Sequence, residues 1–322
     1  MAIHTNTMGI PRLNQFLRAS GDGYIQEIAL RDLSGKRLAV DASIYMYRFL
    51  GDRCLLAGIY QMGMLFWKWG IDPVFVFDGA PPKEKQEAQQ ERQKRKEDAY
   101  VAHKRLEQAV QTGATPVGPE TSAELEQLRR KSLRLGKRRV SEVRELLDGL
   151  GITCMDAPEE ADSVCAGLVA SGDCWACLSD DTDMFACGCP RILRDLDLLE
   201  GTCVLYDWEG QRTALGIGQE EFRLVCAAAG CDYGPGVPGV DVQDAWALWL
   251  QWRRQPLGLA LEDFLVGAGA TWRGGDPANL RAAADVFRHM GGTQYRAQES
   301  REPDLAKTRA FLEDHGFVFA DE

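Results

Sequence analysis

Carboxylates recur along this chain directly after apolar runs. Two runs, residues 37–41 and 73–78, end in an aspartate, and a third, 174–178, is followed closely by two more. Further acids follow an apolar run near residue 155 and a helix-like segment that ends near residue 230. A single acid in such a place usually caps a helix, but repetition in five segments favours a shared site. The seven candidates are Asp41, Asp78, Glu160, Asp162, Asp181, Asp183 and Asp232.

Seven carboxylates in one cleft would require bound cations. If they converge in one cleft, they cannot all stay ionised unless cations bind among them. Hard oxygen ligands suit Mg²⁺ or Mn²⁺. Two such ions about 4 Å apart can activate a water molecule and hold a phosphodiester for hydrolysis. The acids therefore predict a phosphodiester-cleaving metal centre, provided that the fold brings them together.

The elements around these acids indicate how the fold does so. Residues 37–41 and 73–78 have the continuous apolar pattern of buried parallel strands, and residues 57–70 between them are typical of a helix. Strand, helix and strand form the unit of a doubly wound α/β sheet. Ligands bind such sheets at the carboxyl ends of the strands, where Asp41 and Asp78 are expected. Further strands are predicted at residues 151–156, 174–178, 191–193 and 203–206.

Helices are predicted in most of the remaining chain. Pro158 suits the first turn of a helix that carries Glu160 and Asp162. Two more helices, at residues 220–230 and 245–254, are joined by a turn-rich linker. The remainder of the sequence is predicted to be helical with loops.

Charge is distributed unevenly along the chain. The 322 residues have a net charge of −11, which by itself argues against nucleic-acid binding. Residues 83–144, however, hold 16 Lys and Arg against 10 Asp and Glu, a net charge of +6. Charged helices over 83–107 and 122–149 flank a break rich in Gly and Pro, so a helical hairpin projecting from the body is predicted. The alternative is a solvated helical surface, a common fate of charge runs.

The ten cysteines indicate reduced, mostly buried thiols. No apolar stretch reaches membrane-spanning length and no secretory signal is visible, so an intracellular location is expected. Cys174 and Cys177, followed by Cys187 and Cys189, raise a zinc alternative. It is disfavoured, because residues three apart in a strand point to opposite faces.

Six motifs in order along the chain resemble those of the flap endonucleases, within the wider superfamily of XPG-type structure-specific 5′ nucleases. The resemblance extends from Met8 to about Gly316, and the combination is specific although each motif alone is weak. The motifs are Met8-Gly-Ile10, Val40-Asp-Ala-Ser43 with Tyr47, Val76-Phe-Asp-Gly-Ala-Pro-Pro82, Asp156-Ala-Pro-Glu-Glu-Ala-Asp162, Ser179-Asp-Asp-Thr-Asp183 and Gly230-Cys-Asp-Tyr233.

The resemblance implies a PIN-like α/β fold: a parallel-rich central sheet flanked by helices, with a helical arch and a helix–two-turn–helix element. It implies a single nuclease domain over residues 8–322 and an extension at residues 1–7. The implied parts are an N-terminal nuclease part at 8–82, a basic arch at 83–144, an internal nuclease part at 145–215, a duplex-binding helix–two-turn–helix at 216–256 and C-terminal helices at 257–322.

The resemblance also implies roles for individual residues. Asp41, Asp78, Glu160 and Asp162 would surround one Mg²⁺ ion, and Asp181, Asp183 and Asp232 would bind a second; Mn²⁺ can substitute. Lys85 and Arg92, which share a helix face, would stabilise charge on the scissile phosphate. Tyr47 would stack on a nucleobase near the cut, although a tyrosine in the core is an equally good interpretation. The DNA-contacting residues implied are Gly9, Tyr47, Lys85, Arg92, Arg95, Lys96, Gly236, Val237 and Gly239.

The activity implied is hydrolysis of DNA at 5′ flaps or other branches, in replication, repair and recombination. A 5′→3′ exonuclease acting at nicks and ends is one alternative, and a metal-dependent ribonuclease on the same core is another. A non-catalytic protein that binds branched DNA is a more remote alternative. The expected partner is branched DNA, bound by a monomer. The expected location is the nucleus or the site of DNA replication if the source is eukaryotic or viral, and the cytoplasm otherwise. A sliding clamp is a partner of the family, but no clamp-binding peptide is visible here.

Several features depart from the family pattern. Asp162 stands where flap endonucleases usually have Glu, which shortens a metal ligand. Gly236 replaces a common hydroxyl residue and Asp241 an expected glycine, so weaker binding of duplex DNA and of the family's K⁺ ion is expected there. Seven residues precede Met8, so either translation begins at Met8 or the extension needs a path away from the active site. The ending soon after Phe319 resembles that of a viral or otherwise reduced member.

Overall fold

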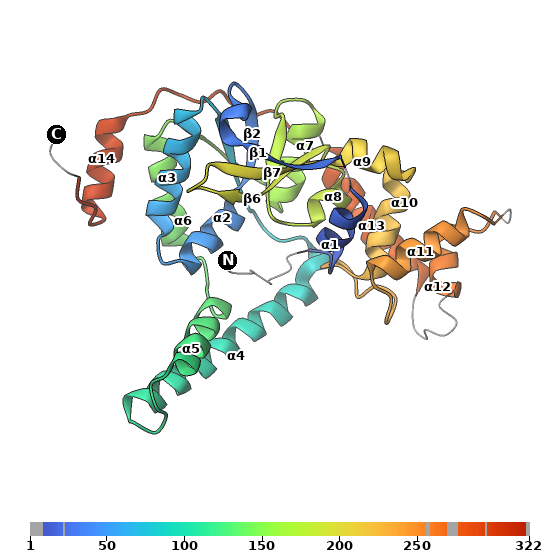
Figure 1. Cartoon of the computed structure of the whole chain (residues 1–322), viewed down its shortest axis with the longest axis horizontal. Coiled ribbons are helices and arrows are strands. Elements are labelled where there is room, and N and C mark those ends of the chain that lie inside the picture. Colours follow the sequence, from blue (N-terminus) through green and yellow to red (C-terminus); the bar gives the residue numbers. More distant parts are fainter. Residues whose placement is uncertain (1–8, 22, 256–257, 269–275, 294, 320–322) are drawn as a thin grey trace.

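A seven-stranded sheet runs through the body of the protein (Figure 1). The computed structural model describes residues 9–21, 23–255, 258–268, 276–293 and 295–319, so the predicted extension at residues 1–7 lies outside the described residues, as does Met8. The strand order is β1-β7-β6-β5-β2-β3-β4. The strands are β1 Ile25–Ala29, β2 Arg37–Asp41, β3 Asp72–Phe77, β4 Thr153–Asp156, β5 Ala176–Leu178, β6 Arg191–Asp197 and β7 Thr202–Asp207.

Five neighbouring strands, from β6 to β4, are parallel, and β7 pairs antiparallel with both β6 and β1. The predicted α/β fold with a parallel-rich sheet is therefore confirmed. Ala39 of β2 lies between Val74 of β3 and Cys177 of β5. Because these strands are parallel, their carboxyl ends meet at one edge of the sheet. Strand β1 was not predicted, because Gln26 and Glu27 are exposed at the sheet edge and interrupt the apolar pattern.

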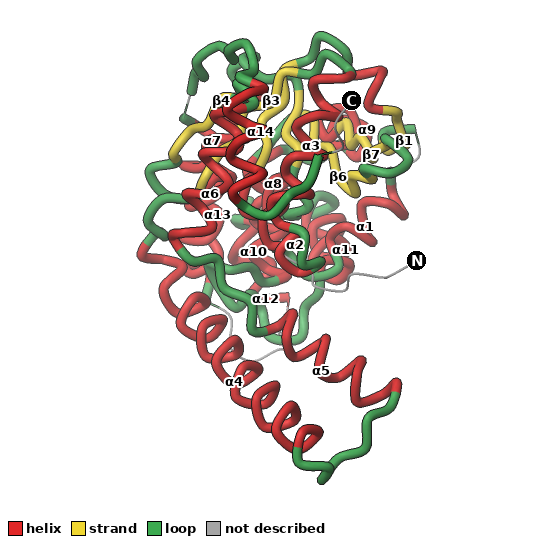
Figure 2. The backbone as a smooth tube through the Cα atoms, turned by 90° about the vertical axis from the view of Figure 1, so that its left-hand side faces the viewer, coloured by secondary structure: helices red, strands yellow, loops and turns green. Residues whose placement is uncertain are grey.

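Helices cover both faces of the sheet (Figure 2). Successive strand residues point to opposite faces, and both faces are buried, which explains the continuous apolar runs. Val40 and Phe75 belong to the first of two hydrophobic cores. It also contains residues of α2 Ala42–Gly51, α3 Leu55–Lys68, α6 Lys137–Gly149 and α14 Leu305–Asp314. Ala39 and Val74 belong to the second core with α1 Leu13–Ser20, α7 Ala161–Ala170, α8 Asp183–Cys187, α9 Trp208–Leu215, α10 Gln219–Ala229, α11 Val242–Trp252, α12 Leu261–Ala268 and α13 Pro277–Gly292.

A helical hairpin projects from the body, as Figures 1 and 2 show. It consists of α4 (Gln86–Gln111) and α5 (Pro119–Lys131), which are joined by a turn. Helix α5 buries none of its residues. Ion pairs hold its end to the corner between α2 and α3: Arg130 lies 2.9 Å from Asp52, and Arg53 lies 3.0 Å from Glu126.

Two helix predictions were wrong in their bounds. The single helix predicted over residues 122–149 is two helices, α5 and α6, because only α6 buries apolar side chains such as Val143 and Leu146 against the body. Gly136 precedes α6 in an extended conformation and allows the change of direction. The helix predicted from Pro158 begins at Ala161, because Asp78 accepts a hydrogen bond from the Ala161 N–H.

Each of the ten cysteines lies in the described part of the chain and is free. Cys174 and Cys177 are both buried, and burial raises the pKa of each thiol. Within the described residues, no helix is long and apolar enough to cross a membrane.

Candidate active site

Three of the candidate acids lie at the carboxyl edge of the sheet. Asp41 is the last residue of β2, Asp78 directly follows β3, and Asp181 lies just beyond β5. Since β2 lies between β3 and β5, these three segments are neighbours. The charges of Asp78 and Asp181 act on Asp41 and raise its pKa further than burial does alone. The sheet therefore brings these acids together.

Backbone amides and hydroxyls hold the first two carboxylates in place. Asp41 accepts from Ser43 N at 3.0 Å through Oδ1, and from Ser179 Oγ at 3.3 Å through Oδ2. Asp78 accepts from Ala161 N at 2.9 Å through Oδ1, while Ser43 Oγ donates to its Oδ2. The positive ends of α2 and α7 therefore favour negative charge at both acids. The role of these two serines was not predicted, although both stand in the motifs Val40-Asp-Ala-Ser43 and Ser179-Asp-Asp-Thr-Asp183.

Asp181 and Asp183 are linked to each other and lie against Gly9. Asp183 N donates to Asp181 Oδ1 at 2.9 Å. Gly9 has a φ of +77°, and a Cβ there would lie 2.3 Å from Asp181 Oδ1 and 2.6 Å from Asp183 Oδ1. Only glycine fits this position without moving a carboxylate. The N-terminal backbone thus forms one side of the acidic cluster.

Lys85 and Arg92 bring positive charge to the remaining acids. Lys85 ends the short 3-10 helix η2 (Lys83–Lys85), and its Nζ lies 2.6 Å from Glu160 Oε1 and 3.1 Å from Asp232 Oδ2. Arg92, on α4, lies 2.7 Å from Asp232 Oδ2. Lys85 is buried and Arg92 is about half exposed. The base of the hairpin is therefore attached to the carboxylates by these two cations.

At the side of the cluster formed by Glu160 and Asp232, ion pairs with Lys85 and Arg92 outweigh the effect of burial on the pKa values of Lys85 and Asp232. Burial acts to lower the pKa of Lys85, but Glu160 and Asp232 outweigh it, and the pKa is raised. Burial acts to raise the pKa of Asp232, but Lys85 and Arg92 outweigh it, and the pKa is lowered. Cations from the hairpin thus compensate this side of the cluster.

At Asp162, Asp181 and Asp183, by contrast, burial outweighs the nearby cations. Burial raises the pKa of Asp162, Asp181 and Asp183, and the charge of Asp181 raises that of the other two further. Asp162 Oδ1 and Asp183 Oδ1 are buried and have no hydrogen-bond partner among the described residues. Buried charges of this kind are unfavourable unless a cation binds beside them.

The donor set fits a hard divalent cation. In the described part of the chain, no three His, Cys, Asp or Glu side chains stand in positions that could hold a metal ion. The contacts of Lys85 give a physical reason, because Glu160 and Asp232 turn toward its ammonium group. The unpaired oxygens of Asp162 and Asp183, together with an all-oxygen ligand set, nevertheless match the preference of Mg²⁺ and Mn²⁺.

Tyr47 lies beside the acids rather than in the closed core. It is half-buried on α2, and Lys96 Nζ lies 3.1 Å from its hydroxyl and 4.6 Å from its ring centroid. Both residues line a cavity of about 560 Å³ that also reaches Asp78 and Lys85. Arg95 pairs instead with Glu91 on the exposed surface of α4 and is not among the described residues that line this cavity.

The three predicted duplex-binding residues in the turn between α10 and α11 differ from one another in their surroundings. A Cβ at Gly236, where φ is +73°, would lie 2.5 Å from Gly230 N and 2.6 Å from Ala228 O, so a side chain would not fit there. Val237 is buried, and its N–H donates to Ala228 O at 2.8 Å. The side chain and the N–H of Val237 are therefore both engaged within the protein, and its contact with DNA stays a prediction. Gly239 is exposed, as a DNA contact requires.

Asp241 caps helix α11. Its Oδ1 accepts from Gln243 N at 2.9 Å and Asp244 N at 3.1 Å, and its Oδ2 pairs with Arg12 at 2.9 Å. The Asp244 N–H, with Gln243 and Arg12, holds the pKa of Asp241 below its usual value. The chain's own carboxylate thus occupies the end of the helix that would otherwise favour a phosphate.

Tyr233 belongs to the site, although no role was predicted for it. Its hydroxyl donates to Glu160 Oε2, and Lys85 Nζ lies 5.5 Å from its ring centroid. The ring also packs edge-on against Phe287 at 5.1 Å. Tyr233 therefore orients Glu160 from a rigid support. Its place in the Gly230-Cys-Asp-Tyr233 motif, next to Asp232, was the signal in the sequence.

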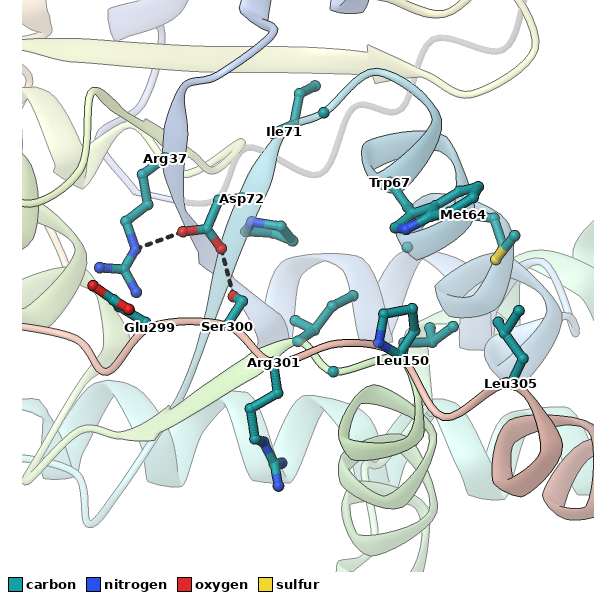
Figure 3. Close-up of a pocket in the computed structure, with 16 residues that line it drawn as sticks. Arg37, Met64, Trp67, Ile71, Asp72, Leu150, Glu299, Ser300, Arg301 and Leu305 are labelled. Carbon is teal, nitrogen blue, oxygen red and sulfur yellow. Dashed lines mark hydrogen bonds and ion pairs between the residues drawn. The ribbon is translucent and has the colours of Figure 1, made fainter.

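A second cavity, of about 540 Å³, lies at the other end of the strands (Figure 3). Arg37, at the start of β2, pairs with Asp72 of β3 at 3.1 Å along its lining. Met64, Trp67 and Leu305 are among the apolar residues of its lining. Because β2 runs from Arg37 to Asp41, the length of the strand separates this cavity from the acids.

The sheet, the projecting hairpin and the acids at the sheet edge define a PIN-like α/β protein. Solved structures share this fold. The catalytic core of Rad2 in complex with DNA substrate matches with a TM-score of 0.67 at 22% identity, over 93% of this chain and 94% of that one. The flap endonuclease-1 from Methanococcus jannaschii matches with a TM-score of 0.63 at 22% identity, over 92% and 91%.

Sequence comparisons identify the family. The model of the XPG N-terminal domain matches residues 8–99, and that of the XPG I-region matches residues 151–232. Flap endonuclease 1 of Leishmania infantum is 31% identical over 263 residues, which is 74% of this chain and 64% of that protein. Flap endonuclease 1 of Entamoeba histolytica is 27% identical over 301 residues, which is 88% and 76%. The chain belongs to the XPG family, and it spans 64% of the length of the Leishmania relatives.

Proposed function

We propose that this protein is a metal-dependent, structure-specific nuclease that hydrolyses DNA phosphodiesters at 5′ flaps or related branches. The observation that carries the proposal is the meeting of seven acids beneath a basic hairpin, with two buried carboxylate oxygens that lack partners among the described residues. An acidic site alone repels DNA, whereas cations bound among the acids and the basic hairpin attract it. The relatives named flap endonuclease 1 support a branched DNA substrate.

The roles of the residues follow from their positions. Asp41, Asp78, Glu160 and Asp162 would hold one divalent ion, and Asp181, Asp183 and Asp232 a second. When bound, Mg²⁺ or Mn²⁺ supplies an activated water and neutralises charge on the leaving oxygen. Lys85 and Arg92 then exchange their carboxylate partners for the scissile phosphate and stabilise its developing charge. Tyr47 offers a stacking surface for a nearby base.

Comparing several substrates tests the substrate class. A duplex with a free 5′ flap, the same flap blocked by a bulky 5′ group, a nicked duplex and an RNA strand are each incubated with the protein and Mg²⁺. The proposal expects cutting near the base of the free flap. Mononucleotides released from the nick would favour the 5′→3′ exonuclease instead, and preferential cutting of RNA would favour the ribonuclease.

Substitution of Gly9 by Ala is expected to slow flap cleavage by roughly 10²-fold, since an added Cβ displaces the carboxylates of Asp181 and Asp183. Single-turnover kinetics measure the loss. The matched control is Gly23→Ala, which has a similar φ of +87° but no heavy atom within 4 Å of the added Cβ. Equal losses in the two variants would attribute the effect to backbone strain and remove the argument for Gly9.

Substitution of Asp241 by Asn is expected to raise affinity for duplex DNA by roughly threefold at low salt. The change removes one negative charge and frees Arg12 for a phosphate, so the salt dependence of binding steepens by up to about one counterion. Because Asn is also a good N-cap residue, thermal stability is retained. Asp304→Asn, at the cap of the distant α14, is the control. Unchanged or weaker duplex binding by Asp241→Asn would place the duplex elsewhere.

The proposed setting is the interior of the cell, where replication, repair and recombination produce branched DNA. We propose a monomer, because all seven acids come from one chain. A K⁺ ion at the turn between α10 and α11 and a sliding-clamp partner both remain predictions from the resemblance.

A further inference from the structure

The cavity beside the acids has an uncharged polar side that the proposed chemistry does not use. Helix α4 contributes Gln86, Gln89, Gln90 and Gln93 to its lining. Gln86, Gln89 and Gln93 are three and four residues apart, so they share one face of the helix. Most of the other residues at this end of α4 are charged or exposed. The amides are therefore concentrated where the helix faces the cavity.

These amides are available to a ligand. The side-chain amides of Gln86, Gln89 and Gln90 form no hydrogen bond with another group in the described ranges. Gln89 is half-buried, whereas Gln93 lies beside Arg134. A half-buried amide needs hydrogen-bond partners once a ligand excludes water from around it. Gln89 is therefore the residue best placed to recognise what enters.

The chemistry of the cavity fits a nucleobase. A phosphate would bind the cations Lys85 and Arg92, which lie at one side of the same cavity. A glutamine amide presents a donor and an acceptor next to each other, which complements the hydrogen-bonding edge of a base. Tyr47 adds an aromatic face. The volume of about 560 Å³ is within the usual range for ligand sites.

We propose that this cavity holds the unpaired base next to the scissile phosphate, and that Gln89 recognises its edge by hydrogen bonding. This inference rests on the proposed function, and it adds a requirement that stacking alone does not impose. A base that stacks but cannot form hydrogen bonds leaves the amide of Gln89 without a partner. Such a base is bound less well, whatever its shape.

Flaps with an isosteric base test the proposal. One flap carries thymine, and its counterparts carry difluorotoluene, which has the same shape but poor hydrogen-bonding groups, at either nucleotide flanking the cut. The wild-type protein is expected to cut one of the difluorotoluene flaps about tenfold more slowly. Gln89→Leu is expected to cut all flaps at equal rates. Gln108→Leu, an exposed position on the same helix, keeps the wild-type difference.

The outcomes separate this inference from the proposed function. Cutting of the thymine flap by the wild-type protein upholds the nuclease, whichever way the isostere behaves. Equal rates on all flaps with the wild-type protein, or a difference that Gln89→Leu retains, would overturn the role of Gln89. Failure to cut any flap would contradict the nuclease itself and this inference with it. Circular dichroism melting of both variants shows that they remain folded.

Discussion

Asp181→Asn is expected to reduce the rate of flap cleavage by roughly 10³-fold while flap binding stays nearly unchanged. The Asn side chain retains an oxygen that can accept from Asp183 N, so the local structure is preserved. It lacks the charge needed to hold a cation beside the unpaired oxygens of Asp162 and Asp183. Single-turnover cleavage and fluorescence anisotropy measure the rate and the affinity separately.

The stability of the same variant gives a second result. Asp181 lies in a buried cluster of like charges, and burial raises its pKa. Removing its charge is therefore expected to leave the melting temperature without metal unchanged or higher. The stabilisation that Mg²⁺ confers on the wild-type protein is expected to shrink, because ligand binding stabilises only the folded state.

Asp180→Asn is the matched control for Asp181→Asn. Asp180 is the preceding residue, but its Oδ1 accepts from Asp195 N at 2.8 Å, outside the acidic cluster. Its cleavage rate is expected to remain within about threefold of wild type, the range of ordinary surface changes. A full rate with Asp181→Asn, or equal losses in the two variants, would contradict the assignment of Asp181 to the metal centre.

Lys85→Met is expected to slow cleavage by roughly 10² to 10³-fold, because it removes a cation that stabilises the phosphate in the transition state. The variant is also expected to lose roughly 3 kcal/mol of unfolding free energy without metal, since the half-buried Glu160 and Asp232 lose their buried partner. Mg²⁺ restores much of this loss by supplying positive charge. Thermal melts with and without Mg²⁺, together with cleavage rates, measure both effects.

Lys94→Met separates the role of Lys85 from the general charge of the hairpin. Lys94 is exposed and lies two residues from Arg92, on the other side of α4. Its loss is expected to change cleavage by only a few fold and to leave stability unchanged. If Lys94→Met were as inactive as Lys85→Met, the total charge of the hairpin would explain the result, and the contact with the acids would not.

Elements of the fold could be predicted where burial of the element leaves a clear apolar pattern in the sequence. Strands β2 and β3 are buried on both faces, so their apolar runs were unambiguous. The bounds of α5 and α6 could not be predicted, because basic residues stand on both sides of residues 132–136 while only α6 packs on the body. Strand β1 was missed because an edge strand with exposed polar residues lacks that signal.

The acids could be predicted because residue type and position at strand ends were both visible in the sequence. The residues that contact these acids could not be paired with them from the sequence, because they come from segments far apart in the chain. Lys85 pairs with acids 75 and 147 residues away along the sequence, and Gly9 contacts Asp181 from the N-terminal segment. The burial of Val237 likewise depends on how α10 packs, which local sequence does not specify.

One measurement tests the central claim most directly: cleavage of a 5′-labelled flap duplex by the wild-type protein across a Mg²⁺ titration, with products mapped to the nucleotide. The proposed centre predicts no cutting in EDTA, and with Mg²⁺ a cut near the flap base that leaves a 5′-phosphate on the downstream product. Cutting that persists in EDTA would contradict a metal centre at the acids. Flap binding without cutting in either Mg²⁺ or Mn²⁺ would contradict the nuclease and favour a non-catalytic protein that binds branched DNA.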